Sequence, residues 1–161
     1  MSPAAIFPIA IRVAAIRIAV LTMLVPVALT VPRAAPAGDT AAPDSAQVYF
    51  IEPQDGDTVA APVRVVFGLR GMGIAPAGTD AAGTGHHHLL IDRPPFGEGA
   101  AGEDDRPLPS DGHHRHFGGG QTETRLELAP GRHRLQLVLG DKTHIPHDPP
   151  VVSDVIEITV E

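Results

Sequence analysis

The sequence contains no cysteine and no tryptophan, and its aromatic residues (Phe, Trp, Tyr) make up 4% of the chain. Without cysteine the chain has neither disulfides nor a cysteine that could carry a lipid anchor, and a metal site would have to use imidazole and carboxylate ligands. Because aromatic residues are scarce, we expect a core of mainly valine, isoleucine and leucine. A small domain of this composition depends for its stability on that core, or on a bound ion.

Common catalytic motifs are also missing. The chain has a single lysine, Lys142, so the glycine run 118–120 is not followed by the lysine of a phosphate-binding loop, and no Gly-x-Ser-x-Gly motif occurs. These absences favour a protein that is not an enzyme, and a metal-dependent enzyme that uses an open coordination position is the alternative. The glycine run is expected instead to allow a tight bend between strands, or a close approach to the neighbouring histidines.

The N-terminal segment has the order of features found in a secretory signal peptide. Arg12 and Arg17 precede an apolar run over residues 18–31, no acidic residue occurs there, and Ala35-Pro36-Ala37 offers a cleavage pattern of small residues. The run is shorter than the roughly 20 residues that a spanning helix needs. We predict a signal peptide over residues 1–37, a flexible linker over 38–46 and one domain over 47–161. An uncleaved anchor is the alternative.

Export implies a periplasmic or secreted protein. Cleavage after Ala37 removes three of the 12 basic residues, none of the 19 acidic ones and none of the nine histidines. The resulting negative charge repels phosphate backbones, so we expect no nucleic-acid partner, and no membrane contact after cleavage. It attracts cations, which agrees with a metal ion as the partner, alongside another periplasmic protein if the ion is handed on.

Short segments of alternating apolar residues, separated by Gly- and Pro-rich turns, predict β-strands throughout the domain. In the clearest, Leu135, Leu137 and Leu139 form the apolar set. The pattern predicts an all-β fold, a single immunoglobulin-like antiparallel sandwich of about seven strands. The predicted strands cover residues 47–51, 62–69, 86–92, 113–117, 121–128 and 133–139 and a last strand ending at residue 161. The long segment 93–112 is a predicted loop of the kind that often has a function.

Eight of the nine histidines form three clusters at or beside Gly- and Pro-rich turns. The clusters are His86-His87-His88, His113-His114-Arg115-His116 and His144-Ile145-Pro146-His147. Residues two apart on a strand share a face, so His86 and His88 point the same way, as do His114 and His116. His144 and His147 lie in an irregular segment, where the spacing allows their side chains to converge without requiring it.

Imidazole pairs of this kind can hold a transition-metal ion. We predict His86, His88, His114, His116, His144 and His147 as metal ligands, with Asp141 and Asp148 as residues that orient them or ligate directly. Imidazole and carboxylate donors suit several divalent ions, and export favours copper or zinc.

Other roles for the histidines remain open. His87 shares a face with Leu89 and Ile91, so we expect it in the core, and His133 is expected to be structural. The remaining histidines would otherwise bond to loop carbonyls in a structural or interaction domain that forms a binding face for a partner, or make a surface that responds to pH.

Five long stretches of the domain are distinctive: EPQDGD (52–57), GMGIAPAG (71–78), GHHHLLID (85–92), HFGGGQTE (116–123) and LGDKTHIPHDPP (139–150). They resemble a family of exported bacterial domains of unknown function (DUF4399). The resemblance covers residues 48–160 and implies a bacterial, periplasmic or secreted protein. It implies no activity, and no residue role follows from it. The predicted architecture is also similar to that of periplasmic copper-binding β-sandwiches, in layout alone.

Overall fold

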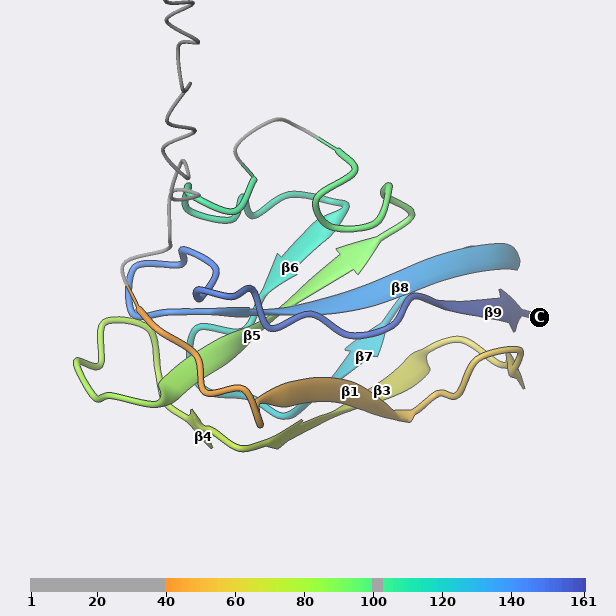
Figure 1. The fold of residues 1–161 in the computed structure, drawn as a ribbon. Helices are drawn as coiled ribbons and strands as arrows, with labels where there is room; N and C mark the ends of the chain where they lie inside the picture. The colour runs from red at the N-terminus through yellow and green to blue at the C-terminus, as the bar shows by residue number, and fades with distance from the viewer. Residues whose placement is uncertain (1–39, 100–102) are drawn as a thin grey trace, which may run out of the picture. The chain divides into compact units, whose positions relative to one another are not determined.

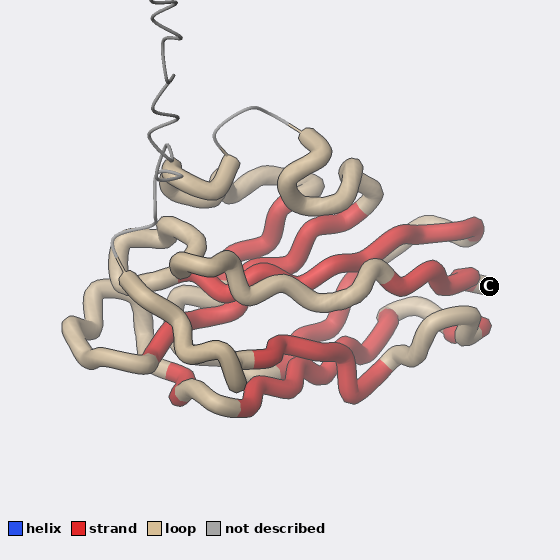
Figure 2. Tube along the Cα trace, viewed as in Figure 1, coloured by secondary structure: helices blue, strands red, loops and turns tan. Residues whose placement is uncertain are grey.

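The computed structural model describes residues 40–99 and 103–161, which contain strands, turns and loops but no helix (Figure 2). A helix long and apolar enough to cross a membrane is thus not found in these ranges. The predicted signal peptide lies outside the described residues. The strands are β1 (Gln47–Glu52), β2 (Thr58–Val59), β3 (Val63–Arg70), β4 (Gly73–Ile74), β5 (Thr84–Ile91), β6 (His114–His116), β7 (Glu123–Leu126), β8 (Gly131–Gly140) and β9 (Ile156–Val160).

These strands form two sheets packed face to face (Figure 1). The smaller sheet has the order β1-β3-β7. The larger one has six strands in the order β2-β9-β8-β5-β4, with β6 also paired to β5. The prediction of an all-β sandwich is therefore confirmed.

Two details of the prediction need correction. All seven predicted strands are present, but the described residues contain nine, because β2 and β4 are additional. These two strands also pair in parallel, β2 with β9 and β4 with β5, whereas the other pairings are antiparallel. Each has two residues, which is too short to show an alternating pattern.

The main core lies between the two sheets. The inward residues of β8, Leu135, Leu137 and Leu139, are fully buried there, and Val65 and Phe67 of β3 lie in the same cluster. Burial of each such side chain contributes roughly 1.5–3 kcal/mol to folding. This apolar layer determines which face of each strand points into the core. The side chains on the opposite face are therefore available for other contacts.

The outer face of the larger sheet is also covered in part. Leu90 of β5 and Val138 of β8 form a second small apolar cluster with Leu108. Leu108 belongs to the long segment between β5 and β6, which passes over this face of the sheet, on the side away from β1 and β3 (Figure 1). As a result β5 is buried on both faces along most of its length.

Residues 40–42, part of the predicted linker, bond to the loop that follows β8. The backbone N–H of Ala42 donates to the carbonyl of Asp148, and the N–H of Asp148 donates to the carbonyl of Thr40, at 2.8 and 3.0 Å. The hydroxyl of Thr40 donates to the carboxylate of Asp141 at 2.9 Å. This end of the linker is thus held against the domain.

Candidate metal centre

Strand β5 places His86 and His88 side by side on the outer face of the larger sheet. The alternation of a strand sends them to the face opposite His87, and their ring centroids lie 4.9 Å apart. Both side chains are almost fully buried. Gly140 of β8 makes room for one of them, because a Cβ at that position would lie 2.8 Å from Nε2 of His88.

Strand β6 brings a third imidazole to the same place. The antiparallel register of β5 and β6 sets His116 directly opposite His88. The ring of His116 lies 5.0 Å from the rings of both His86 and His88. Gly118 leaves space for it, since a Cβ there would overlap the His116 ring. The expectation that the glycine run allows a close approach to the histidines is confirmed at this position.

The loop after β8 supplies His144, whose backbone has a positive φ of 69°. Its N–H donates to the carbonyl of Asp141, and its own carbonyl accepts from the N–H of Leu108. One carboxylate oxygen of Asp141 accepts hydrogen bonds from the backbone and hydroxyl of Thr143 and from the backbone of Ile145. This turn fixes the position of the His144 ring.

Asp141 was predicted either to orient the histidines or to ligate the ion directly. Burial raises its pKa, yet the hydrogen bonds from Thr143, Thr40 and Ile145 outweigh burial and hold the pKa of Asp141 below its ordinary value. The carboxylate is therefore charged at neutral pH. One of its oxygens accepts hydrogen bonds within the loop and the other accepts from Thr40, so Asp141 orients the loop that carries His144.

The four imidazoles form a compact set of nitrogen donors. His86, His88, His116 and His144 each offer one ring nitrogen, and these nitrogens all lie within 4.8 Å of one another. Nε2 of His86 is 3.0 Å from Nε2 of His88 and 3.1 Å from Nδ1 of His144. Four nitrogens bound tetrahedrally to one ion at 2.0–2.1 Å would lie roughly 3.3 Å apart. The two short distances would therefore lengthen slightly, and the longer ones would shorten, to complete such a site.

Burial keeps the rings of His86, His88 and His116 uncharged at neutral pH. Desolvation, together with the neighbouring imidazoles, lowers the pKa of His86 to about 4 and that of His88 to about 2. The pKa of the exposed His116 is also lowered, by partial burial and by His144. A neutral imidazole has a free lone pair, which is the form that binds metal ions.

The comparisons with known proteins identify a family. The model of a domain of unknown function (DUF4399) matches residues 65–161, more than half of the chain. The chain belongs to this family. The match includes all four histidines of the cluster, but not the EPQDGD stretch that contributed to the resemblance. No curated protein and no solved structure matches the chain.

Two of the predicted ligands of this DUF4399 domain lie outside the four-histidine cluster. His114 is fully buried beside the cluster, and its ring meets the His88 ring edge to face with centroids 5.5 Å apart. Neither ring nitrogen of His114 has a hydrogen-bond partner among the described residues. His147 is buried too, but its nitrogens lie 3.3 Å from the carbonyl of Leu139 and 3.2 Å from that of Thr84.

His147 lies outside the cluster because its segment is irregular, where residues three apart, such as His144 and His147, need not share a face. Asp148 was selected with Asp141, but its side chain is exposed and the loop uses its backbone groups. The sequence analysis missed Gly140 and Thr40. No motif marks either, because their roles come from contacts with residues far away in the chain.

The remaining histidines that the sequence analysis singled out are structural. His87 is buried against Phe67, with ring centroids 4.9 Å apart, and Nδ1 lies 3.2 Å from the carbonyl of Gln121. The core placement predicted for His87 is confirmed. Nδ1 of His133 lies 2.8 Å from a carboxylate oxygen of Asp92, and Nε2 lies 2.8 Å from the carbonyl of Ala129. Partial burial lowers the pKa of His133, but these two contacts outweigh it and the net pKa is raised.

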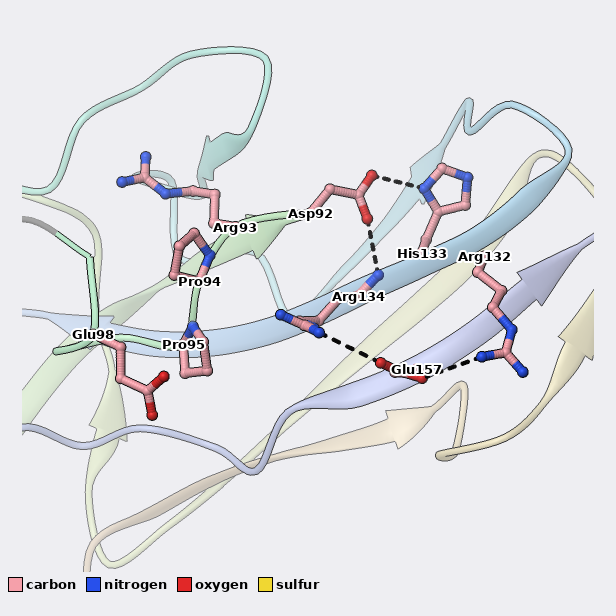
Figure 3. A pocket seen from close by; sticks show the side chains of 9 residues that line it. All are labelled: Asp92, Arg93, Pro94, Pro95, Glu98, Arg132, His133, Arg134 and Glu157. Carbon is pink, nitrogen blue, oxygen red and sulfur yellow. Dashed lines mark hydrogen bonds and ion pairs between the residues drawn. The ribbon is translucent and has the colours of Figure 1, made fainter.

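A separate open pocket of about 580 Å³ surrounds the Asp92–His133 pair (Figure 3). Asp92 also accepts a hydrogen bond from the backbone of Arg134, and Glu157 lies between the guanidinium groups of Arg132 and Arg134, 3.9 and 3.6 Å away. Within this pocket Asp92 is paired with His133, and Glu157 is paired with Arg132 and Arg134. The lining contains none of the four cluster histidines; it consists of Asp92, Arg93, Pro94, Pro95, Glu98, Arg132, His133, Arg134 and Glu157.

Proposed function

We propose that this DUF4399 domain is an exported, periplasmic or secreted module that binds one transition-metal ion through His86, His88, His116 and His144. One observation carries the proposal: four imidazole donors from three separate chain segments lie within 4.8 Å of one another. Each segment is held by its own constraint, the β5 strand, the β5–β6 register and the Asp141 turn.

The donor set favours copper or zinc. Zinc accepts imidazole nitrogens in tetrahedral coordination, and copper(II) also binds imidazole well. Calcium and magnesium prefer oxygen ligands, and none of the four donors is a carboxylate. A site with four protein ligands and no open position suits binding, storage or delivery better than catalysis.

An interaction domain with a histidine-stiffened loop is the second candidate. The contacts of His86 with His88 and His144, at hydrogen-bond distance, support it. Both Nδ1 atoms of His86 and His88 are buried with no partner in the described part of the chain, which costs roughly 1–3 kcal/mol for each. An ion bound at the Nε2 atoms would leave both Nδ1 atoms unpartnered too, but its bonds to nitrogen offset that cost better than hydrogen bonds between neutral rings do.

Calorimetry on the purified, metal-free protein tests the proposal. We expect zinc(II) or copper(II) to bind with micromolar or tighter affinity at one ion per chain. The His133→Ala variant is the control, because it removes a histidine outside the cluster, and it should bind as the wild type does. Absence of binding heat with both ions, or an unfolding temperature that chelator does not change, would support the interaction domain instead.

Export has its own test. When the full chain is produced in a bacterial host, we expect the product in the periplasm or medium, with Gly38 as its first residue by N-terminal sequencing. Retention of Met1 together with fractionation into the membrane would instead establish the N-terminal segment as an uncleaved anchor.

A further inference from the structure

The four imidazoles of the cluster differ in exposure. His86 and His88 are buried, His144 is partly exposed, and His116 is exposed to solvent. A solvent-borne ligand can therefore reach the cluster most directly beside His116. The following inference rests on the proposed metal-binding function.

His116 is also held by the smallest element. Strand β6 has three residues and pairs with β5, at the edge of the larger sheet, where β4 pairs with the start of β5. By contrast, His86 and His88 lie on β5 between two neighbours, and the backbone of His144 is fixed by bonds to Asp141 and Leu108. Short edge elements open locally with a smaller free energy than central strands.

From exposure and attachment together, we infer that His116 is the exchangeable ligand, past which the ion enters and leaves. During release to an acceptor, the bond from the ion to the His116 nitrogen breaks, and a lone pair from the acceptor forms a new bond to the ion. His86, His88 and His144 hold the ion throughout this step. No electron is transferred, and His116 leaves as neutral imidazole.

Gly118 provides a second way to test the assignment. The Gly118→Ala variant keeps all four histidines but adds a Cβ that would overlap the His116 ring. The glycine is not among those with positive φ, so alanine is compatible with its backbone. The added methyl group should displace the His116 ring and weaken its bond to the ion without altering the buried ligands.

The experiment measures zinc release from the loaded protein to a colorimetric chelator in a stopped-flow instrument. We expect His116→Ala to release zinc at least about tenfold faster than the wild type, because even a residue that only orients a ligand commonly contributes roughly tenfold in affinity. Gly118→Ala should lie between the two. His86→Ala should lose most of the equilibrium affinity. Arg115→Ala, an exposed change on the same strand, should release zinc as the wild type does.

Release at the wild-type rate from both His116→Ala and Gly118→Ala would overturn the inference while leaving the proposed function intact. Equal losses of affinity in His116→Ala and His86→Ala would do the same. If the wild-type protein binds no zinc or copper at all, the proposed function fails, and this inference with it. Since His116 is exposed, the unfolding temperatures of the metal-free His116→Ala, Gly118→Ala and Arg115→Ala variants should match that of the wild type and so exclude misfolding as the cause of faster release.

Discussion

The two faces of strand β5 give the same residue type opposite roles. His86 and His88 point outward and meet two other imidazoles, whereas His87 points inward and packs against Phe67 in the core. All three side chains are almost fully buried. Burial alone thus does not separate a candidate ligand from a core residue, whereas the neighbours on each face do.

The comparison shows what distinguishes a metal site from a buried polar side chain. Nδ1 of His87 faces a backbone carbonyl, and the rest of its ring faces apolar groups. Nε2 of His88, by contrast, faces another imidazole nitrogen. Several nitrogens directed at one point make a ligand set, whereas a nitrogen directed at a carbonyl is already satisfied.

The strongest test of the different roles of the two faces removes one histidine from each face. We expect His88→Ala to abolish zinc or copper binding measured by calorimetry, because it removes a buried donor from the centre of the set. His87→Ala should keep the metal affinity but lose about 3 kcal/mol of unfolding free energy, as for other truncations of large buried rings. Chemical denaturation of the metal-free proteins measures the second effect.

The opposite pattern would contradict the assignment of the two faces. If His87→Ala lost metal binding while His88→Ala kept it, the ligand set would have to lie on the inner face. His147→Ala is a useful companion, since that histidine is buried but bonds to carbonyls outside the cluster. It should destabilise the protein and leave metal binding in place.

A smaller expected effect, the pH dependence of the free energy of unfolding, tests the role of the inner face. Burial lowers the pKa of His87 to about 4, and those of His86 and His114 to about 4 as well. Between pH 6.5 and about 4 these histidines bind protons in the unfolded chain but stay unprotonated in the folded protein. The free energy of unfolding therefore falls as the pH falls through this window, and the loss is absent above it.

Urea denaturation of the metal-free protein at several pH values measures this fall. His87 alone accounts for about 3 kcal/mol of it, because a tenfold difference in proton affinity between the folded and unfolded states corresponds to about 1.4 kcal/mol. His87→Leu, which keeps the position apolar, should reduce the fall by that amount without changing metal affinity at pH 7. A fall of unchanged size in this variant would place the acid sensitivity on the outer face.

Much of the fold was predictable because its signals are local. The alternation of Leu135, Leu137 and Leu139 marked β8, and the same period assigned His87 to the core side of β5. Strands β2 and β4 were missed because two residues cannot display a period. They form through pairing with β9 and β5, which depends on the rest of the fold.

The candidate site was predictable to the level of clusters. The strand period places His86 and His88 on one face without any structural information. The strand period equally placed His114 on the same face as His116, yet the register sets His114 opposite Leu90, two pairs farther along β5 and away from His86. Residues two apart on a strand are about 7 Å from each other. This distance is enough to leave His114 outside the cluster while His116 lies in it.

The sequence by itself therefore determined the all-β class, the family and the histidine-rich segments that contain the cluster. The tertiary structure decided which of those histidines meet. The reason is the range of the forces: side-chain alternation is set by neighbouring residues, whereas the meeting of His88, His116 and His144 depends on the β5–β6 register and on the turn around Asp141. These contacts form only when distant parts of the chain have packed together.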